Sequence, residues 1–64
     1  MTKVQDVTAG TIVDDEAGGT LSVRKTYDYV EPREGRRIAF TDLNGRFLDR
    51  EYDTDIEVVG YFDM

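Results

Sequence analysis

The chain has 64 residues and carries 14 acidic against eight basic side chains, which gives a net charge of −6. It contains no cysteine and no histidine, so disulfides, thiolate zinc sites and the usual general base near neutral pH are excluded. The negative charge disfavours non-specific binding to nucleic acid or to anionic membranes. A chain of this length fits one small domain over residues 1–64, and such domains are marginally stable unless a partner supports them.

The charge is unevenly distributed along the chain. Residues 1–31 sum to −3, residues 32–46 to +2 and residues 47–64 to −5. No apolar run approaches the roughly 20 residues that span a bilayer, and the first residues lack the apolar centre of a signal peptide. We therefore expect a soluble cytoplasmic protein with a dipolar surface.

The first third of the chain predicts one strand followed by a loop. Ile12 and Val13 follow β-branched residues and a glycine, which places a strand near residues 9–13, and the opening residues can pair as a lead-in strand. Residues 14–19 combine three adjacent acids with two glycines, a composition typical of a loop.

Residues 20–30 form the longest strand candidate. Leu21, Val23, Tyr27 and Tyr29 alternate on one face, which predicts that all four point toward the core. Lys25 interrupts this face, and we expect its ammonium to reach the rim while its stem packs inside. Pro32 and Gly35 then indicate a chain reversal.

Residues 36–52 carry the clearest signal, a β-hairpin with a bulged three-residue loop. Asp42 suits the start of a type I turn and Gly45 the left-handed position that follows it. This loop pairs Phe40 with Leu48 and sets Arg37 opposite Glu51, so the pattern predicts an ion pair between those two charges. It also sets Arg36 beside Tyr52, where a stacked contact is expected.

The rest of the chain completes an all-β fold. Residues 53–55 predict a single 3₁₀ turn, and residues 56–62 a last strand; no segment has helical periodicity. The order and lengths of five sequential strands predict a small five-stranded antiparallel SH3-like barrel, an expectation of architecture without an assigned family. The alternative is an open antiparallel sheet that dimerises.

An acidic stripe occupies alternate positions near the end of the chain. It consists of Asp49, Glu51, Asp53, Asp55 and Glu57. In an extended strand these acids share one face, which permits mimicry of a DNA phosphate row, a divalent-cation site, or a solvated edge that resists aggregation. The spacing fails the EF-hand pattern, since Thr54 and Gly60 stand where glycine and glutamate are needed. No cofactor or metal is predicted.

A basic group offers a competing function. Arg33, Arg36, Arg37 and Arg46, with Tyr27 and Tyr29 nearby, have the chemistry to bind single-stranded nucleic acid. Catalysis is not expected, because the chain has a single serine, Ser22, with no histidine to activate it.

The last strand carries apolar residues on both faces. Val59 and Tyr61 lie opposite the face of Ile56 and Val58, so they either close the barrel against Val4 and Val7 or form a contact surface together with Phe62 and Met64.

The sequence leads to a functional hypothesis of a small, acidic, non-enzymatic protein–protein interaction module, as an accessory or inhibitory protein of a larger complex. It binds a protein partner or a second copy. The contact runs through the last strand, the region of Tyr27 and Tyr29, or the acidic stripe. The predicted partner-binding residues are Val59, Tyr61, Phe62, Asp49, Glu51 and Asp55. The alternative is a nucleic-acid-binding domain that uses the four arginines.

Overall fold

The computed structural model describes residues 1–63 and is all β apart from one 3₁₀ helix. Its elements are β1 (Thr2–Lys3), η1 (Val4–Asp6), β2 (Thr11–Asp14), β3 (Thr20–Ser22), β4 (Lys25–Glu31), β5 (Gly35–Thr41), β6 (Phe47–Glu51), β7 (Asp55–Ile56) and β8 (Val58–Tyr61). Among the described residues no helix has the length and apolar character needed to cross a membrane. Met64, which the sequence grouped with the last strand, lies outside the described part.

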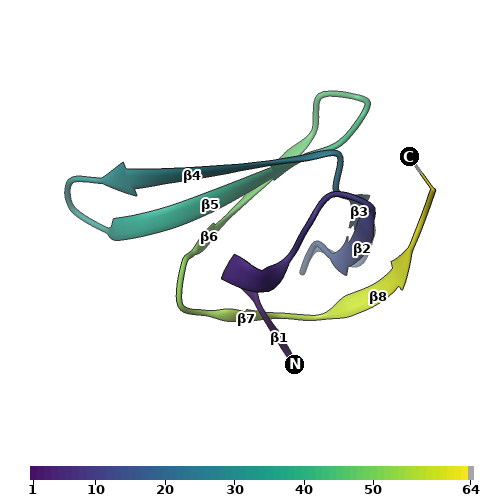
Figure 1. The fold of residues 1–64 in the computed structure, drawn as a ribbon, viewed down its shortest axis with the longest axis horizontal. Helices are drawn as coiled ribbons and strands as arrows, with labels where there is room; N and C mark the ends of the chain where they lie inside the picture. The colour runs from purple at the N-terminus through teal and green to yellow at the C-terminus, as the bar shows by residue number, and fades with distance from the viewer. Residues whose placement is uncertain (64) are drawn as a thin grey trace.

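The strands form three antiparallel sheets, ordered β1–β7, β3–β2–β8 and β4–β5–β6 (Figure 1). The all-β prediction is confirmed, but the closed five-stranded barrel is wrong, because residues 1–63 form eight strands and no ladder joins β6 to the β3–β2–β8 sheet. Two interruptions raise the strand count: the second predicted strand breaks at Val23 and Arg24, and the last breaks at Glu57.

The core lies between the two three-stranded sheets and is completed by the N-terminal segment. Its buried members are Val4, Val7, Val13, Leu21, Val23, Ile38, Phe40 and Ile56. Leu48, Tyr52 and Val58 are partly buried against them. Burial of this apolar surface is the main favourable term in folding, at about 25 cal/mol per Å².

The β5–β6 hairpin has the predicted register. Phe40 pairs with Leu48 and Arg37 lies opposite Glu51. The Asp42 amide donates to the Arg46 carbonyl at 3.0 Å, and Gly45 takes a φ of +83°, where a glycine avoids the steric cost that a Cβ adds. The Arg36 guanidinium stacks 3.8 Å above the centre of the Tyr52 ring, as expected.

The break after β3 overturns one prediction. Leu21 and Val23 are buried, but Tyr27 and Tyr29 are 49 % and 39 % exposed. The irregular residues at 23–24 reverse the alternation, so that in β4 it is Thr26, opposite Phe40, that lies on the core side. A shift of one residue moves every following side chain to the other face of a sheet. Lys25 therefore lies on the outer face with the tyrosines and does not reach out from the core.

Two further predictions need correction at the ends of the chain. The 3₁₀ helix is η1, where the Val7 amide donates to the Val4 carbonyl, and residues 53–54 form a turn instead. β2 begins at Thr11, later than predicted, because Gly10 has a φ of +97°, outside the extended region. The lead-in strand is confirmed, since Thr2 pairs with Ile56.

Candidate protein-binding surfaces

The outer face of the β4–β5–β6 sheet is aromatic. Tyr27 and Tyr29 of β4 and Phe47 of β6, the last of them 70 % exposed, stand on this face beside the smaller Ala39 and Thr41 of β5. We call this set of five residues the aromatic face. The outer side of an antiparallel sheet is normally polar, so exposed aromatic side chains on it make this face a candidate interaction surface.

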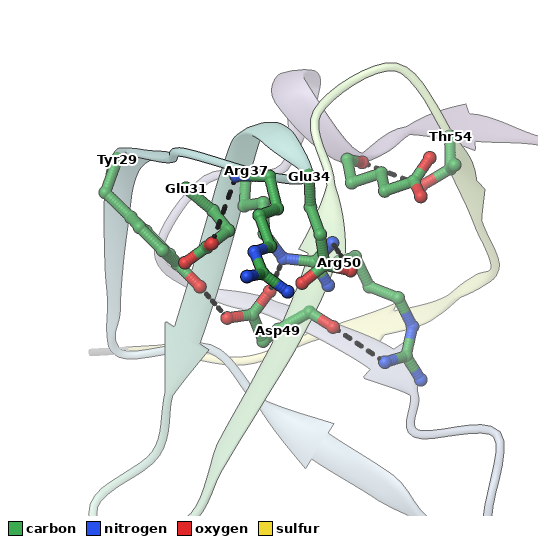
Figure 2. Close-up of polar contacts among 9 residues, drawn as sticks. Tyr29, Glu31, Glu34, Arg37, Asp49, Arg50 and Thr54 are labelled. Atoms are coloured by element: carbon green, nitrogen blue, oxygen red, sulfur yellow. Dashed lines mark hydrogen bonds and ion pairs between the residues drawn. The ribbon is translucent and has the colours of Figure 1, made fainter.

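A hydrogen-bonded group borders the aromatic face and holds its Tyr29 side chain (Figure 2). The Tyr29 hydroxyl donates to the Asp49 carboxylate, which also accepts from Nε of Arg37 at 2.6 Å. Arg37 contacts Glu34 at 3.4 Å as well. The ion pair expected between Arg37 and Glu51 is absent from the described residues, because the guanidinium reaches diagonally to Asp49 although Glu51 stands directly opposite in the ladder.

A shallow open depression continues the aromatic face toward the hairpin loop. It is lined by Arg24, Lys25, Tyr27, Thr41, Asp42, Leu43 and Gly45. Leu43 is 75 % exposed. Within residues 1–63 Arg24 and Lys25 take part in no ion pair, whereas Asp42 accepts the amides of Asn44 and Arg46. The apolar surface thus has a positively charged end.

The predicted acidic stripe is split by the turn after β6. Asp49, Glu51 and Asp55 line one open depression with two arginines, Arg37 and Arg50, which neutralise part of its charge. Asp55 also lies 3.5 Å from Lys3, and Asp53 accepts from Gln5 at 3.4 Å. Since Asp53 and Glu57 lie outside that depression, the five acids form no continuous row.

The four arginines of the alternative hypothesis are dispersed. Arg37 borders the aromatic face, Arg36 pairs with Asp28 at 2.8 Å on the other side of the sheet, and Arg46 pairs with Asp15 at 2.9 Å. The hydrogen bond between Arg36 and Asp28 lowers the pKa of that carboxyl and raises the pKa of the guanidinium. Of these four arginines, Arg33 alone has no ion pair within residues 1–63. The nucleic-acid surface that these residues were predicted to form is not assembled, and such binding stays a prediction.

The β2–β3 loop is fastened to β6 by two arginines. Asp15 accepts the amides of Ala17 and Gly19 and the guanidinium of Arg46, and these contacts lower the pKa of the Asp15 carboxyl. Arg50 reaches Glu16 in the same loop at 3.2 Å. The opposite charges of the loop and of the strand thus link the two sheets where a barrel would have a ladder.

Most edge strands of the three-stranded sheets are protected against pairing with another chain. At β6, Arg50 donates to the outward carbonyl of Asp49, and Thr54 donates to that of Glu51. At β3, Arg46 donates to the carbonyl of Thr20. β4 carries Asp28 on the core side of its sheet, and an inward charge of this kind opposes pairing.

The edge of β8 has no such protection. Val58–Tyr61 contains no charged residue and no proline, and Val59 and Tyr61 are 49 % and 78 % exposed. The two side chains therefore do not close against Val4 and Val7, which are buried in the core. Phe62 is partly exposed and its amide donates to the Gly10 carbonyl at 2.8 Å.

Sequence reasoning missed two members of these surfaces. The predicted hairpin register puts Phe47 opposite Thr41 on the outer face, and this position was sufficient to find it. Leu43 lies in the predicted three-residue loop. A large apolar residue at the centre of an exposed turn was the missed signal.

The described residues contain no group of three or more acids, cysteines or histidines placed to hold a metal ion. No protein-family model matches the chain, and no curated protein and no solved structure matches it either.

Proposed function

We propose that this chain is a small, non-enzymatic protein–protein interaction module that binds a protein partner through the aromatic face. It acts as an accessory or inhibitory protein of a larger complex in the cytoplasm. The observation that supports this function is the outward placement of Tyr27, Tyr29 and Phe47 on a sheet face that no other layer of residues 1–63 covers.

The composition of this surface is that of a binding site. Tyrosine, phenylalanine and arginine are enriched at the centres of protein interfaces, and residues there contribute most of the binding energy. Tyr29 and Arg37 are already held by Asp49, so less side-chain entropy is lost when a partner binds. DNA mimicry is a weaker form of the proposal, since the acids it needs are divided between two regions.

The test uses paired variants of exposed residues. In the double variant Tyr27→Ser, Phe47→Ser, two large apolar contacts are lost while the core is untouched. Val30→Ser is the matched control, because Val30 is 72 % exposed on the other side of the same sheet. Tagged wild type and both variants are incubated with native lysate, and bound proteins and nucleic acids are identified after washing at low and high salt.

We expect a protein that wild type and the Val30→Ser control retain at high salt and that the double variant releases. Retention of the same protein by the double variant would refute the aromatic face as the binding site. Recovery of nucleic acid without protein would instead favour the arginine hypothesis, with a negative slope of log affinity against log salt of about 0.7 for each phosphate contact.

A further inference from the structure

The free edge of β8 presents backbone groups as well as apolar side chains. On the opposite edge of β2, the Val23 amide donates to the Thr11 carbonyl at 2.8 Å, so Thr11 directs its backbone groups toward β3. Tyr61 lies opposite Thr11 in the β2–β8 ladder and is therefore at a non-hydrogen-bonded position of that ladder. Its N–H and C=O point away from β2, to the open side.

Val59 is a second residue of β8 with an unusual place in the ladder, because it has no partner residue in β2. The register passes from Val58 opposite Val13 to Gly60 opposite Ile12, so Val59 is the extra residue of a β-bulge. Tyr61 lies on the same face of the sheet as Val58, because their ladder partners Thr11 and Val13 lie on one face and Ile12 on the other. The bulge thus breaks the alternation at Val59, and Val59 and Tyr61 each expose an apolar side chain along the strand edge. A strand that adds to an edge of this kind is bound by main-chain hydrogen bonds, and the side chains on one of its faces add further contacts.

Charge determines which occupant fits. Residues 53–63 contain four acids and no base, and β8 is flanked by the exposed Glu57 and Asp63. A second copy of the chain is disfavoured, because the antiparallel register that pairs Val59 with the copy's Tyr61 also sets Glu57 opposite Asp63. Like charges directly opposite one another destabilise a strand pair.

We propose that the edge of β8 binds an extended, basic segment of a protein partner by strand addition. The segment pairs its backbone with Tyr61, packs apolar side chains against the exposed Val59 and Tyr61, and places lysine or arginine near Glu57 and Asp63. β8 runs along the border of the molecule, apart from the β4–β5–β6 sheet (Figure 1), so this site does not depend on the aromatic face.

The probe is a synthetic peptide, acetyl-Lys-Lys-Val-Thr-Val-Thr-Val-Lys-Lys-amide, titrated into the isotope-labelled full chain and followed by NMR. One control peptide replaces every lysine by glutamate, and a second carries N-methyl groups on alternate backbone amides. The protein variants are Tyr61→Pro, which removes an N–H that β2 does not use, and Tyr61→Ser, which removes only the ring. Tyr27→Ser, on the aromatic face, is the matched control variant.

We expect the lysine peptide to shift the amide signals of residues 59–61 and to slow hydrogen exchange at Tyr61. Binding should weaken by about tenfold or more with the glutamate peptide, with the N-methylated peptide and with Tyr61→Pro, and should be unchanged in Tyr27→Ser. Tyr61→Ser should weaken binding without abolishing the exchange protection.

Three outcomes overturn the proposal. The first is equal binding of the lysine and N-methylated peptides, because strand addition requires the backbone amides. The second is the absence of any shift at residues 59–61 when the lysine peptide is added to wild-type protein that gives a folded spectrum. The third is a dimer whose Tyr61 amide is protected without peptide, which makes a second copy the occupant.

Discussion

The Arg46 guanidinium lies 2.9 Å from the Asp15 carboxylate, and this ion pair joins the start of β6 to the β2–β3 loop. The Asp15 side chain is only 10 % exposed. Arg46 donates to the Thr20 carbonyl at 3.3 Å as well, so one side chain contacts both ends of the loop. Side-chain ion pairs, rather than a backbone ladder, link the sheets at this boundary.

The stability of the protein should therefore fall in acid. Hydrogen bonds from the amides of Ala17 and Gly19, together with Arg46, lower the pKa of Asp15 in the folded state, so the unfolded chain binds this proton more tightly. The stabilisation is fully present above the unfolded pKa of about 3.9 and is lost as the pH falls through the lower folded value.

Urea denaturation between pH 7 and pH 2.5 tests this expectation. Asp15→Asn should be less stable than wild type at pH 7 and should lose less stability on acidification. Asp6→Asn is the control, because Asp6 is exposed and makes no side-chain hydrogen bond or ion pair within residues 1–63. An Asp15→Asn variant with the same acid-dependent loss as wild type contradicts the role given to Asp15.

Asp49 and Glu51 should differ in their contribution to stability, although both are acids of β6. Asp49→Ala leaves the partly buried Arg37 without its main partner, which should lower the free energy of unfolding by about 1–3 kcal/mol. Glu51→Ala removes an exposed acid that forms no ion pair in the described chain, and should change stability by less than about 0.5 kcal/mol. Equal effects in chemical denaturation would contradict the assignment of Asp49 as the main partner of Arg37.

Phe40 and Phe47 provide a matched comparison of core and surface. Phe40 is fully buried, so Phe40→Ala should cost about 3–5 kcal/mol, enough to unfold a domain of this size. Phe47→Ala, on the outer face of the neighbouring strand, should retain a dispersed amide NMR spectrum and stay within about 0.5 kcal/mol of wild type. A folded Phe40→Ala variant of unchanged stability would place the core elsewhere.

Two glycines should respond in opposite ways to alanine. At Gly45 the φ of +83° strains any Cβ although the space is open, so Gly45→Ala should destabilise by about 1–2 kcal/mol. At Gly60 a Cβ meets only the Ile12 Cδ1 at 3.7 Å, an ordinary contact, and Gly60→Ala should stabilise by about 0.4–1 kcal/mol by restricting the unfolded chain. Thermal unfolding of the two variants gives the comparison directly.

The hairpin was predictable from sequence because its determinants are local. Asp42 and Gly45 set the loop, the loop sets the register, and the register places Phe40 beside Leu48. The acidic loop at residues 14–19 was equally visible, but its arginine partners were not, since Arg46 and Arg50 lie more than 25 residues away in the chain.

The break after β3 could not be derived with the same certainty, and the candidate site depends on it. No glycine or proline marks Val23 or Arg24, and Lys25 on the apolar face was the single irregularity in the pattern. When that residue is taken as the sign of a reversal, Tyr27 and Tyr29 turn outward and join Phe47. The aromatic face thus follows from one backbone irregularity, whereas the apolar character of Val59 and Tyr61 was visible in the alternation itself.

The β4–β5 hairpin extends beyond the core (Figure 1). Its far end has exposed side chains on both faces. The turn at Pro32 and Arg33 therefore carries none of the packing that holds the two sheets together. Because the chain has no cysteine, Arg33→Cys would supply a single thiol at the tip of a molecule whose longest dimension is 34 Å. A fluorophore or a surface tether attached there leaves the aromatic face and the β8 edge open. The end of this hairpin is therefore a suitable attachment site for binding assays on immobilised protein.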